Sequence, residues 1–301
     1  MNSYVVGLFW ACVAVYGVAS LAAVWGVVLG RARLLDWAIW IGAVGLAVHT
    51  AAIVLRWAAA GRLPVVESFE NTLVGAWAIS LALQVLVRWA PSVKVAAVVA
   101  LPFVLLTLGY GATKSPAIPA YLPAYQSNWL VTHVVFAWFT YSSYCLAAAL
   151  AAAELLKTRA MRAASGGGAA AGSEPGDVSP GDFYDRLPSI PALQDMTFRL
   201  VVLGFISNAV MIATGAIWAY KLWGSYWGWD PVETGSLVTW LAYGLYLHLK
   251  LTLGWRGPRL AWIALAALLG IAMVFWGVQL FPSSYHLFRQ MGAGKIQGPQ
   301  S

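Results

Sequence analysis

Eight long apolar segments dominate the sequence, at residues of roughly 4–29, 35–59, 71–89, 94–112, 128–156, 197–220, 233–253 and 259–280. Each is close to the ~20 residues that a helix needs to cross the hydrocarbon core of a bilayer. None alternates polar and apolar residues as a strand would, and backbone groups in lipid must be hydrogen-bonded within the structure. We therefore predict an all-α polytopic membrane protein, a bundle of about eight transmembrane helices forming one domain over residues 1–301.

The basic residues predict the orientation of this bundle. Of the 18 lysines and arginines, twelve lie in the loops after the first, third, fifth and seventh segments, and six lie on the other side. Because cytoplasmic loops carry the excess of positive charge, we expect the first set to be cytoplasmic and both termini to be extracytoplasmic, in the cytoplasmic membrane. The first segment is expected to be retained, because it lacks a basic leader and is too long for a cleaved signal peptide.

Composition and motifs exclude several classes of function. The basic residues form short clusters between apolar segments and not a basic face, so nucleic-acid binding is not expected. Cys12 and Cys145 each lie in an apolar segment without a C-x-x-C pair, which argues against thiol-redox chemistry and a cysteine zinc site. The chain has no phosphate loop, G-x-S-x-G or H-E-x-x-H, so ATP hydrolysis, serine hydrolysis and zinc proteolysis are unsupported.

Three segments between the apolar runs are long enough to matter. Residues 157–196 contain the low-complexity run AASGGGAAAGSEPGDVSPG, which predicts a flexible cytoplasmic loop. Residues 113–127 hold three prolines and are expected to form an extended outer loop. Residues 221–232 form a tryptophan-rich loop on the same outer side.

The four histidines are the informative polar residues. His133 lies about one turn inside the outer end of the fifth segment, and His286 follows the eighth segment on the same side. His248 lies toward the cytoplasmic half of the seventh segment, and His49 lies near mid-membrane, where ionisable groups face a bundle interior or a cavity. Plain alternatives stay open: solvent or headgroup contacts for His133 and His286, and for His49 a hydrogen bond to a neighbouring helix.

Two outer histidines near one aromatic loop suggest haem. Neutral imidazole is a good axial ligand for haem iron, and two imidazoles from different helices can clamp the flat macrocycle. The faces of a porphyrin need an apolar, aromatic surface, while its propionates need donors near water. Indole N–H groups, Lys221 or Arg62 could supply those donors.

The DPVET end of the tryptophan-rich loop has a structural explanation. Asp230 is expected to be the N-cap of the seventh helix, with Pro231 at its first position and Glu233 at the capping-box position. We therefore expect helix capping to be the main role of both carboxylates.

The tryptophans of this loop exceed what a membrane belt requires. Belts of Trp and Tyr at the interface are ordinary, but they need no glycine partners. Here Trp223, Trp227 and Trp229 are interleaved with Gly224 and Gly228, and glycine permits unusual dihedrals and close approach of a ligand. The pattern indicates aromatic rings arranged around a flat ligand.

The stretch WGSYWGWDPVET, followed by LVTWLAYGLYLH, closely resembles the tryptophan-rich (WWD) signature of the cytochrome c assembly family. Members of that family handle haem on the outer side of energy-transducing membranes. Within it, the sequence is most similar to the CcsA (ResC) branch, the polytopic subunit of the System II cytochrome c synthase. The resemblance covers most of the chain, including the P-x-x-x-S-F-E-N-T-L stretch after the second segment.

The resemblance implies specific roles. His133 and His286 would be the axial ligands of haem b held against the loop, at residues Trp223, Gly224, Trp227, Trp229 and Asp230. His248 would belong to an inner haem site whose second ligand lies in a partner membrane subunit, CcsB (ResB). His49 is a further candidate ligand that matches no family position.

The sequence departs from the family pattern at two places. The family often has Gly-His before the proline that follows the second segment, whereas this chain has GRLP with Arg62. The usual Gly-Leu-His-Ser-Tyr after the last segment is here SSYHLF, so the His286 assignment depends on position.

The implied function is haem export and presentation, with covalent attachment to apocytochromes that carry C-x-x-C-H. No catalytic residue of the chain's own is predicted, and thiol-reducing proteins and membrane lipid would be indirect partners. The alternatives are the haem-delivery or lyase subunit of System I, a haem-b electron-transfer subunit and a secondary transporter. Eight spans argue against both System I subunits. A haem-b electron-transfer subunit would leave the tryptophan-rich loop without a role, and the lack of an inverted repeat argues against a secondary transporter.

Overall fold

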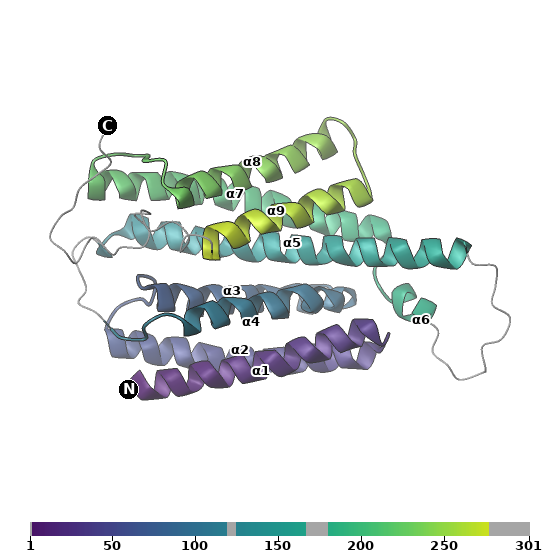
Figure 1. Cartoon of the computed structure of the whole chain (residues 1–301), viewed down its shortest axis with the longest axis horizontal. Helices are drawn as coiled ribbons and strands as arrows, with labels where there is room; N and C mark the ends of the chain where they lie inside the picture. Colours follow the sequence, from purple (N-terminus) through teal and green to yellow (C-terminus); the bar gives the residue numbers. More distant parts are fainter. Residues whose placement is uncertain (1, 119–124, 167–179, 277–301) are drawn as a thin grey trace.

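The computed structural model describes residues 2–118, 125–166 and 180–276, and every regular element in those ranges is a helix (Figure 1). Consecutive long helices run in alternating directions, side by side. They are α1 (Asn2–Val28), α2 (Ala32–Ala60), α3 (Ser68–Trp89), α4 (Ala97–Ala112), α5 (Asn128–Gly166), α7 (Ile190–Trp223), α8 (Pro231–Leu251) and α9 (Pro258–Trp276). The 3-10 helix η1 (Pro91–Ala96) and the short helix α6 (Pro180–Asp185) complete the described part.

The prediction of an all-α polytopic membrane protein is confirmed. Six of the described helices are long and apolar enough to cross a membrane: α1, α2, α3, η1 with α4, α5 and α7. Helix α9 falls among the shorter apolar helices, and α8 lies outside both groups. Each of the eight predicted segments is nevertheless helical where it is described, and the count of eight spans stays a prediction.

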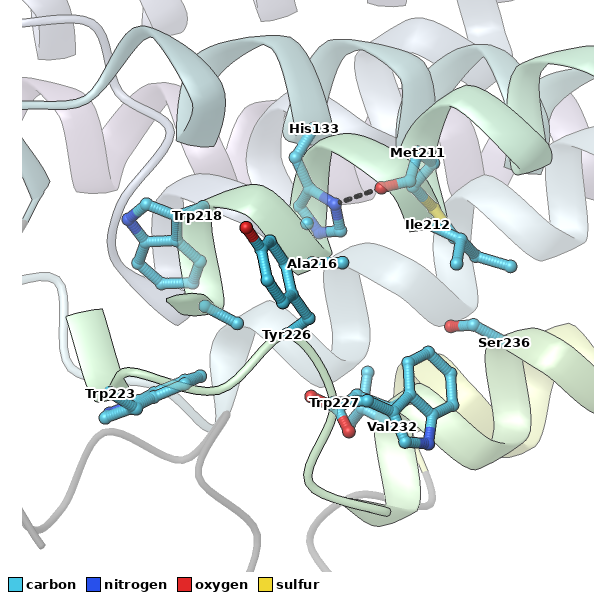
Figure 2. Close-up of a pocket in the computed structure, with 13 residues that line it drawn as sticks. His133, Met211, Ile212, Ala216, Trp218, Trp223, Tyr226, Trp227, Val232 and Ser236 are labelled. Carbon is cyan, nitrogen blue, oxygen red and sulfur yellow. Dashed lines mark hydrogen bonds between the residues drawn. The ribbon is translucent and has the colours of Figure 1, made fainter. Parts of the chain in front are cut away.

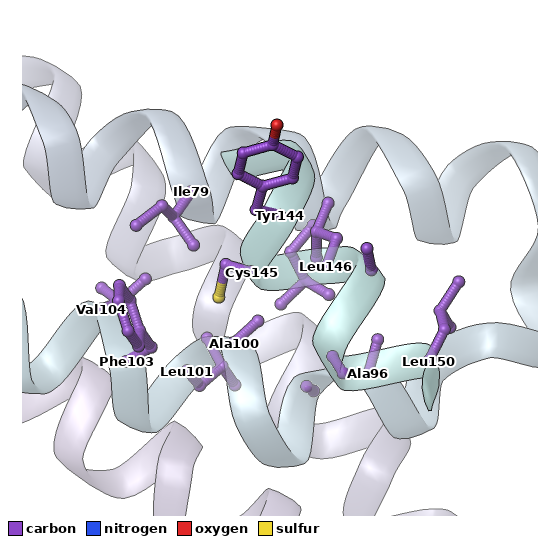
Figure 3. Close-up of a cluster of buried hydrophobic side chains, with 14 of the residues drawn as sticks. Ile79, Ala96, Ala100, Leu101, Phe103, Val104, Tyr144, Cys145, Leu146 and Leu150 are labelled. Atoms are coloured by element: carbon purple, nitrogen blue, oxygen red, sulfur yellow. The ribbon is translucent and has the colours of Figure 1, made fainter. Parts of the chain in front are cut away.

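The bundle has two parts that meet along α5. Helices α1 to α4 pack on one another, and α5 packs mainly against α7 and α9 while also contacting α3 and α4. Figure 3 shows the apolar core at this junction, where Cys145 and Leu146 of α5 lie near Ile79 of α3 and Leu101 of α4. Cys145 is fully buried and unbonded to another cysteine, so it serves as a small core side chain.

The alternating helices divide the connections between two ends of the bundle. The start of α1, the α2–α3 connection, the start of α5 and the tryptophan-rich loop lie at one end, which we call the tryptophan end (Figure 1). The α1–α2, α3–α4 and α8–α9 connections and α6 lie at the opposite end. The structure thus brings the predicted outer loops together, while their side of the membrane stays a prediction.

The segment predicted as a flexible loop, residues 157–196, differs from that prediction where it is described. Residues 157–166 continue α5 and residues 190–196 begin α7, because these stretches are rich in good helix formers. Lys157 also donates hydrogen bonds to the carbonyls of Leu187 and Pro188, at 2.9 and 3.1 Å. As a result, α5 is 39 residues long and extends past its neighbours at the opposite end (Figure 1).

Candidate functional site

A cleft opens at the tryptophan end, between α5, α7, the tryptophan-rich loop and the first turns of α8 (Figure 2). Its enclosed space is about 40 Å³, and the empty volume is about 460 Å³ when the region open to the outside is counted. Its walls combine one imidazole with an unusual number of aromatic rings. The lining includes His133 of α5, Met211, Gly215, Trp218 and Trp223 of α7, Tyr226 and Trp227 of the loop, and Glu233 and Ser236 of α8.

His133 is held in one orientation in this cleft. Its Nδ1 atom lies 2.8 Å from the carbonyl oxygen of Met211 (Figure 2). A carbonyl only accepts hydrogen bonds, so in the neutral imidazole Nδ1 carries the proton and Nε2 carries the lone pair. That tautomer is the one in which Nε2 can ligate a metal while Nδ1–H is anchored to the backbone.

The aromatic rings of the cleft are arranged mainly edge to face. Trp218 is buried, and its ring meets that of Trp223 at a centroid distance of 5.8 Å and an angle of 60°. Trp227 and Trp229 meet at 5.8 Å and 88°. The indole N–H of Trp227 is buried and has no hydrogen-bond partner among the described residues. A buried donor without an acceptor is costly, so it indicates a ligand oxygen at this position.

The backbone of the loop bends at two residues with positive φ. Gly224 ends α7 with φ 77°, and its N–H donates to the Tyr220 carbonyl at 2.8 Å. A Cβ atom there would meet no protein atom within 4 Å, so its positive φ at the helix end, and not protein packing, favours glycine, while its predicted contact with a ligand stays a prediction. Trp229 has φ 55° and is 71% exposed, and within the described ranges it is the only residue other than glycine with positive φ. The loop therefore holds an exposed indole in a strained conformation.

The expected capping of α8 is confirmed. Asp230 is buried, and its Oδ1 accepts a hydrogen bond from the Val232 N–H at 2.8 Å. Glu233 returns to the loop, where its Oε2 accepts from the N–H groups of Gly228 at 2.8 Å and Asp230 at 3.2 Å. The two carboxylates thus fix the loop on the start of α8, which positions Trp227 in the wall of the cleft and Trp229 against Trp227.

The other histidines lie apart from this cleft or outside the described residues. His248 is in the last turn of α8 at the opposite end, exposed, with Nδ1 3.3 Å from Thr252 Oγ1. His286 lies outside the described residues. His49 is fully buried in α2 with its ring 5.8 Å from that of Tyr16, and neither ring nitrogen has a hydrogen-bond partner in the described part of the chain. The backbone of Leu73 in α3 lies near enough to act on the His49 ring, so a hydrogen bond to this neighbouring helix stays a prediction.

Arg62, one of the three predicted sources of a donor to a ligand, is paired within the protein. Arg62 is buried, and its Nη1 pairs with Glu70 Oε2 at 2.7 Å. Arg56, fully buried, donates to Glu70 Oε1 at 2.9 and 3.0 Å and to the carbonyls of Pro116 and Ala117 at 2.6 and 3.0 Å. Glu70 is the residue that joins the two arginines, and we call this network the Glu70 clamp.

The residues beside the Glu70 clamp pack against the wall of the cleft. Val65 and Val66, which precede the start of α3, form one buried cluster with Trp218 and with Val134 of α5. Just outside this cluster, burial and the neighbouring Glu70 carboxylate raise the pKa of the Glu67 carboxyl group. The stretch that carries the clamp therefore packs directly on the wall of the cleft.

Lys221 is the predicted cationic donor that the structure keeps beside the cleft. It is exposed in the last turn of α7, with Nζ 5.8 Å from the ring centroid of Trp129. Both residues line a second, more polar pocket of 800 Å³ empty volume, which shares Trp218 with the cleft. A cation therefore lies just across one indole ring from the aromatic cleft.

The fold and the cleft together define a class of protein: a polytopic helical membrane protein with an aromatic cleft at one end that contains a histidine. The chain belongs to the cytochrome c assembly protein family, whose model matches residues 37–286.

Relatives of the chain include cytochrome c biogenesis proteins called CcsA. The one from Synechococcus sp. (strain CC9605) is 35% identical over 260 residues, which covers 82% of this chain and 84% of that protein. The one from Synechococcus sp. (strain CC9902) is 34% identical over 253 residues, covering 79% and 82%. The one from Prochlorococcus marinus (strain MIT 9303) is 32% identical over 258 residues, covering 80% of each.

A solved structure shares the fold. The cytochrome c haem lyase CcmF superposes with a TM-score of 0.65 at 18% identity, and the match covers all of this chain and 52% of that one. This chain therefore spans about half the length of that lyase. At this identity the likeness supports the architecture of the bundle.

Several residues of the cleft were not among the predicted site residues. Trp218 and Tyr226 lie in or beside the recognised motif, but only the folded chain shows that they line the cleft. Met211 contributes its backbone carbonyl, which no side-chain motif reveals. Gly215 was detectable in principle, because a glycine inside an apolar helix costs helix propensity and usually has a packing reason.

Proposed function

We propose that this protein exports haem b across the cytoplasmic membrane and presents it for covalent attachment to apocytochrome c, as the CcsA-type subunit of a System II cytochrome c synthase. The observation that carries the proposal is the His133 imidazole, which is anchored through Nδ1 in a cleft of tryptophan and tyrosine rings. Membership of the cytochrome c assembly family supports it. The cleft then lies on the extracytoplasmic side, and α8 and α9 complete a set of eight spans.

The residues of the cleft fit haem in three respects. His133 has the tautomer that leaves the Nε2 lone pair for iron. Trp218, Trp223 and Trp227 supply the aromatic surface, and the buried Trp227 N–H lacks an acceptor that a propionate oxygen would provide. Lys221 lies on the far side of Trp218 as a charge partner for a second carboxylate. His286 supplies the second axial imidazole in this proposal.

The protein's contribution is binding and orientation. Attachment adds each thiol of C-x-x-C-H across a haem vinyl group, so that sulfur bonds to one vinyl carbon and the thiol hydrogen goes to the other. The chain needs no nucleophile or general base of its own for this step. Holding the vinyl groups at the open mouth of the cleft makes the encounter with the apocytochrome productive.

His248 fits a second, inner site that is shared with a partner. It is exposed on the outside of the bundle, in the last turn of α8, and no other histidine of the described ranges lies beside it. Thr252 contacts the Nδ1 atom of His248, and an exposed imidazole on a membrane helix can accept a further polar partner. In this proposal a CcsB-type membrane subunit provides that partner and the second ligand of haem on its way outward.

The haem-b electron-transfer alternative is disfavoured by the placement of the histidines. Such a subunit sets its histidine pairs on facing helices. His49 is instead enclosed in the α1–α4 part, and His248 faces outward at the far end of α8. Neither the aromatic cleft nor His133 would have a role in that function.

The decisive experiment removes both outer ligands. The double variant His133→Ala, His286→Ala, purified with its CcsB-type partner, is expected to lose the bis-histidine b-type absorption of the outer haem. A normal spectrum and normal haem content would refute the proposal. His49→Ala is the matched control, because it removes a histidine that lies outside the cleft.

A second variant separates ligand binding from membrane anchoring. Trp227→Phe keeps an aromatic ring at the interface but removes the buried indole N–H. We expect weaker haem retention at unchanged expression and membrane insertion. If insertion alone suffers, the tryptophan is a membrane anchor and the proposed role of the loop is wrong.

A further inference from the structure

We call the packing interface between α5 and α7 the seam. At two positions along the seam, a side-chain ring of α5 packs against a glycine of α7. The two helices pack antiparallel, with the His133 ring of α5 against Gly215 of α7. About three helical turns further along both helices, the Tyr144 ring packs against Gly204 in the same way. At each glycine, a flat side chain from the facing helix thus packs directly against the backbone. We call each of these two positions a glycine seat.

Neither seat has room for a side chain. A Cβ atom built on Gly215 would lie 2.6 Å from His133 Nδ1 and 2.9 Å from Cε1. A Cβ atom built on Gly204 would lie 2.4 Å from Tyr144 Cε1. Glycine in a helix interior is unfavourable compared with alanine, so the close contact is what each position requires.

The Gly215 seat is coupled to the tautomer of His133. The atom closest to the missing Cβ is Nδ1, the same atom that donates to the Met211 carbonyl one turn away on α7. Any group larger than hydrogen at position 215 would displace Nδ1 from that carbonyl. The imidazole would then lose both its fixed direction and the bond that keeps the proton on Nδ1.

We propose that Gly215 and the Met211 carbonyl are positioning elements that present the Nε2 lone pair of His133 to the ligand of the cleft. The proposal rests on the proposed function, in which that ligand is haem iron. Neither group touches the iron, so both act through His133. Partners that orient a metal-ligating histidine in this way typically change metal affinity by roughly 10- to 100-fold when they are lost.

The first test compares Gly215→Ala with Gly204→Ala. The two variants carry the same substitution, on the same helix and the same seam, and both force a ring away, but only the first touches His133. Reduced haem b is titrated into each purified protein. We expect Gly215→Ala to bind haem at the outer site roughly 10- to 100-fold more weakly, with a changed low-spin spectrum, while Gly204→Ala matches the wild type. Equal haem binding by the two variants would overturn the proposal.

The second test reads the imidazole without haem. The chain has four histidines, so ¹⁵N-histidine labelling gives few signals, and the His133 signal is the one lost in His133→Gln. We expect the haem-free wild type to show His133 protonated at Nδ1, and Gly215→Ala to show a mixed or reversed tautomer. An unchanged tautomer in Gly215→Ala would overturn the proposal even if that variant bound haem poorly.

A third comparison separates this proposal from the proposed function. In His133→Gly, measured without added imidazole, Gly215→Ala is expected to cause no further loss of haem binding, because its Cβ has no ring to displace. A further loss would show that Gly215 acts elsewhere and would refute the positioning role. If His133→Gly alone binds haem normally, the proposed function fails, while the tautomer experiment still decides the role of Gly215.

Discussion

The strained, exposed Trp229 allows a prediction that separates ligand binding from folding. Substitution by asparagine, which adopts the left-handed region readily, relieves about 1–2 kcal/mol of backbone strain. It also removes the edge-to-face contact with Trp227, worth about 1 kcal/mol. The indole is 71% exposed, so the lost burial is about 60 Å² of a ~200 Å² side chain, or about 1.5 kcal/mol at ~25 cal/mol/Å².

These terms nearly cancel, leaving Trp229→Asn destabilised by about 1 kcal/mol, or about 2–4 °C in Tm. Its haem retention should fall clearly, because Trp227 in the wall of the cleft loses the ring that packs against it. Thermal unfolding in detergent measures the first quantity, and the haem absorption per protein measures the second. Trp218→Ala is the control for folding, because that ring is buried and its loss costs about 3–5 kcal/mol. A Tm loss in Trp229→Asn as large as in Trp218→Ala, or unchanged haem retention, would refute the reasoning.

Three further predictions concern the supports of the cleft. Glu70→Gln leaves the buried Arg56 without its counter-charge, so we expect a loss of about 3–5 kcal/mol, seen as a much lower Tm; a small shift would contradict the clamp. Glu233→Ala removes the acceptor of the Gly228 N–H, so that amide should exchange hydrogen faster, whereas Glu233→Gln should keep most of the protection. His49→Phe replaces two buried, unbonded ring nitrogens with apolar atoms, so Tm should stay equal or rise and haem content should not change; lost haem would make His49 a ligand.

Local features of the fold could be predicted from the sequence. The start of α8 follows from Asp230, Pro231 and Glu233, because a capping box involves residues within one turn of each other. The helices themselves follow from apolar runs of sufficient length. The end of α5 was placed too early, because a low-complexity run obscured the good helix formers that precede it.

The placement of single side chains depended on contacts that the sequence does not contain. From the sequence alone, Arg62 could be taken as a cation that is available to a ligand. In the fold it pairs with Glu70. The contact of the His49 ring with that of Tyr16 likewise depends on how α1 and α2 pack. The seat of His133 on Gly215 needs the register of α5 against α7, which is set by packing along the whole seam. The motif therefore indicated where the cleft lies, and tertiary packing decided how its histidine is held.

The length of α5 has a consequence beyond the cleft. At 1.5 Å per residue its 39 residues extend about 58 Å, roughly twice the 30 Å hydrocarbon thickness of a bilayer. Figure 1 shows that α5 continues past every other long helix at the opposite end of the bundle. The extra length lets α5 reach beyond the hydrocarbon layer, so the helix itself connects the buried part of the bundle with the aqueous side at that end.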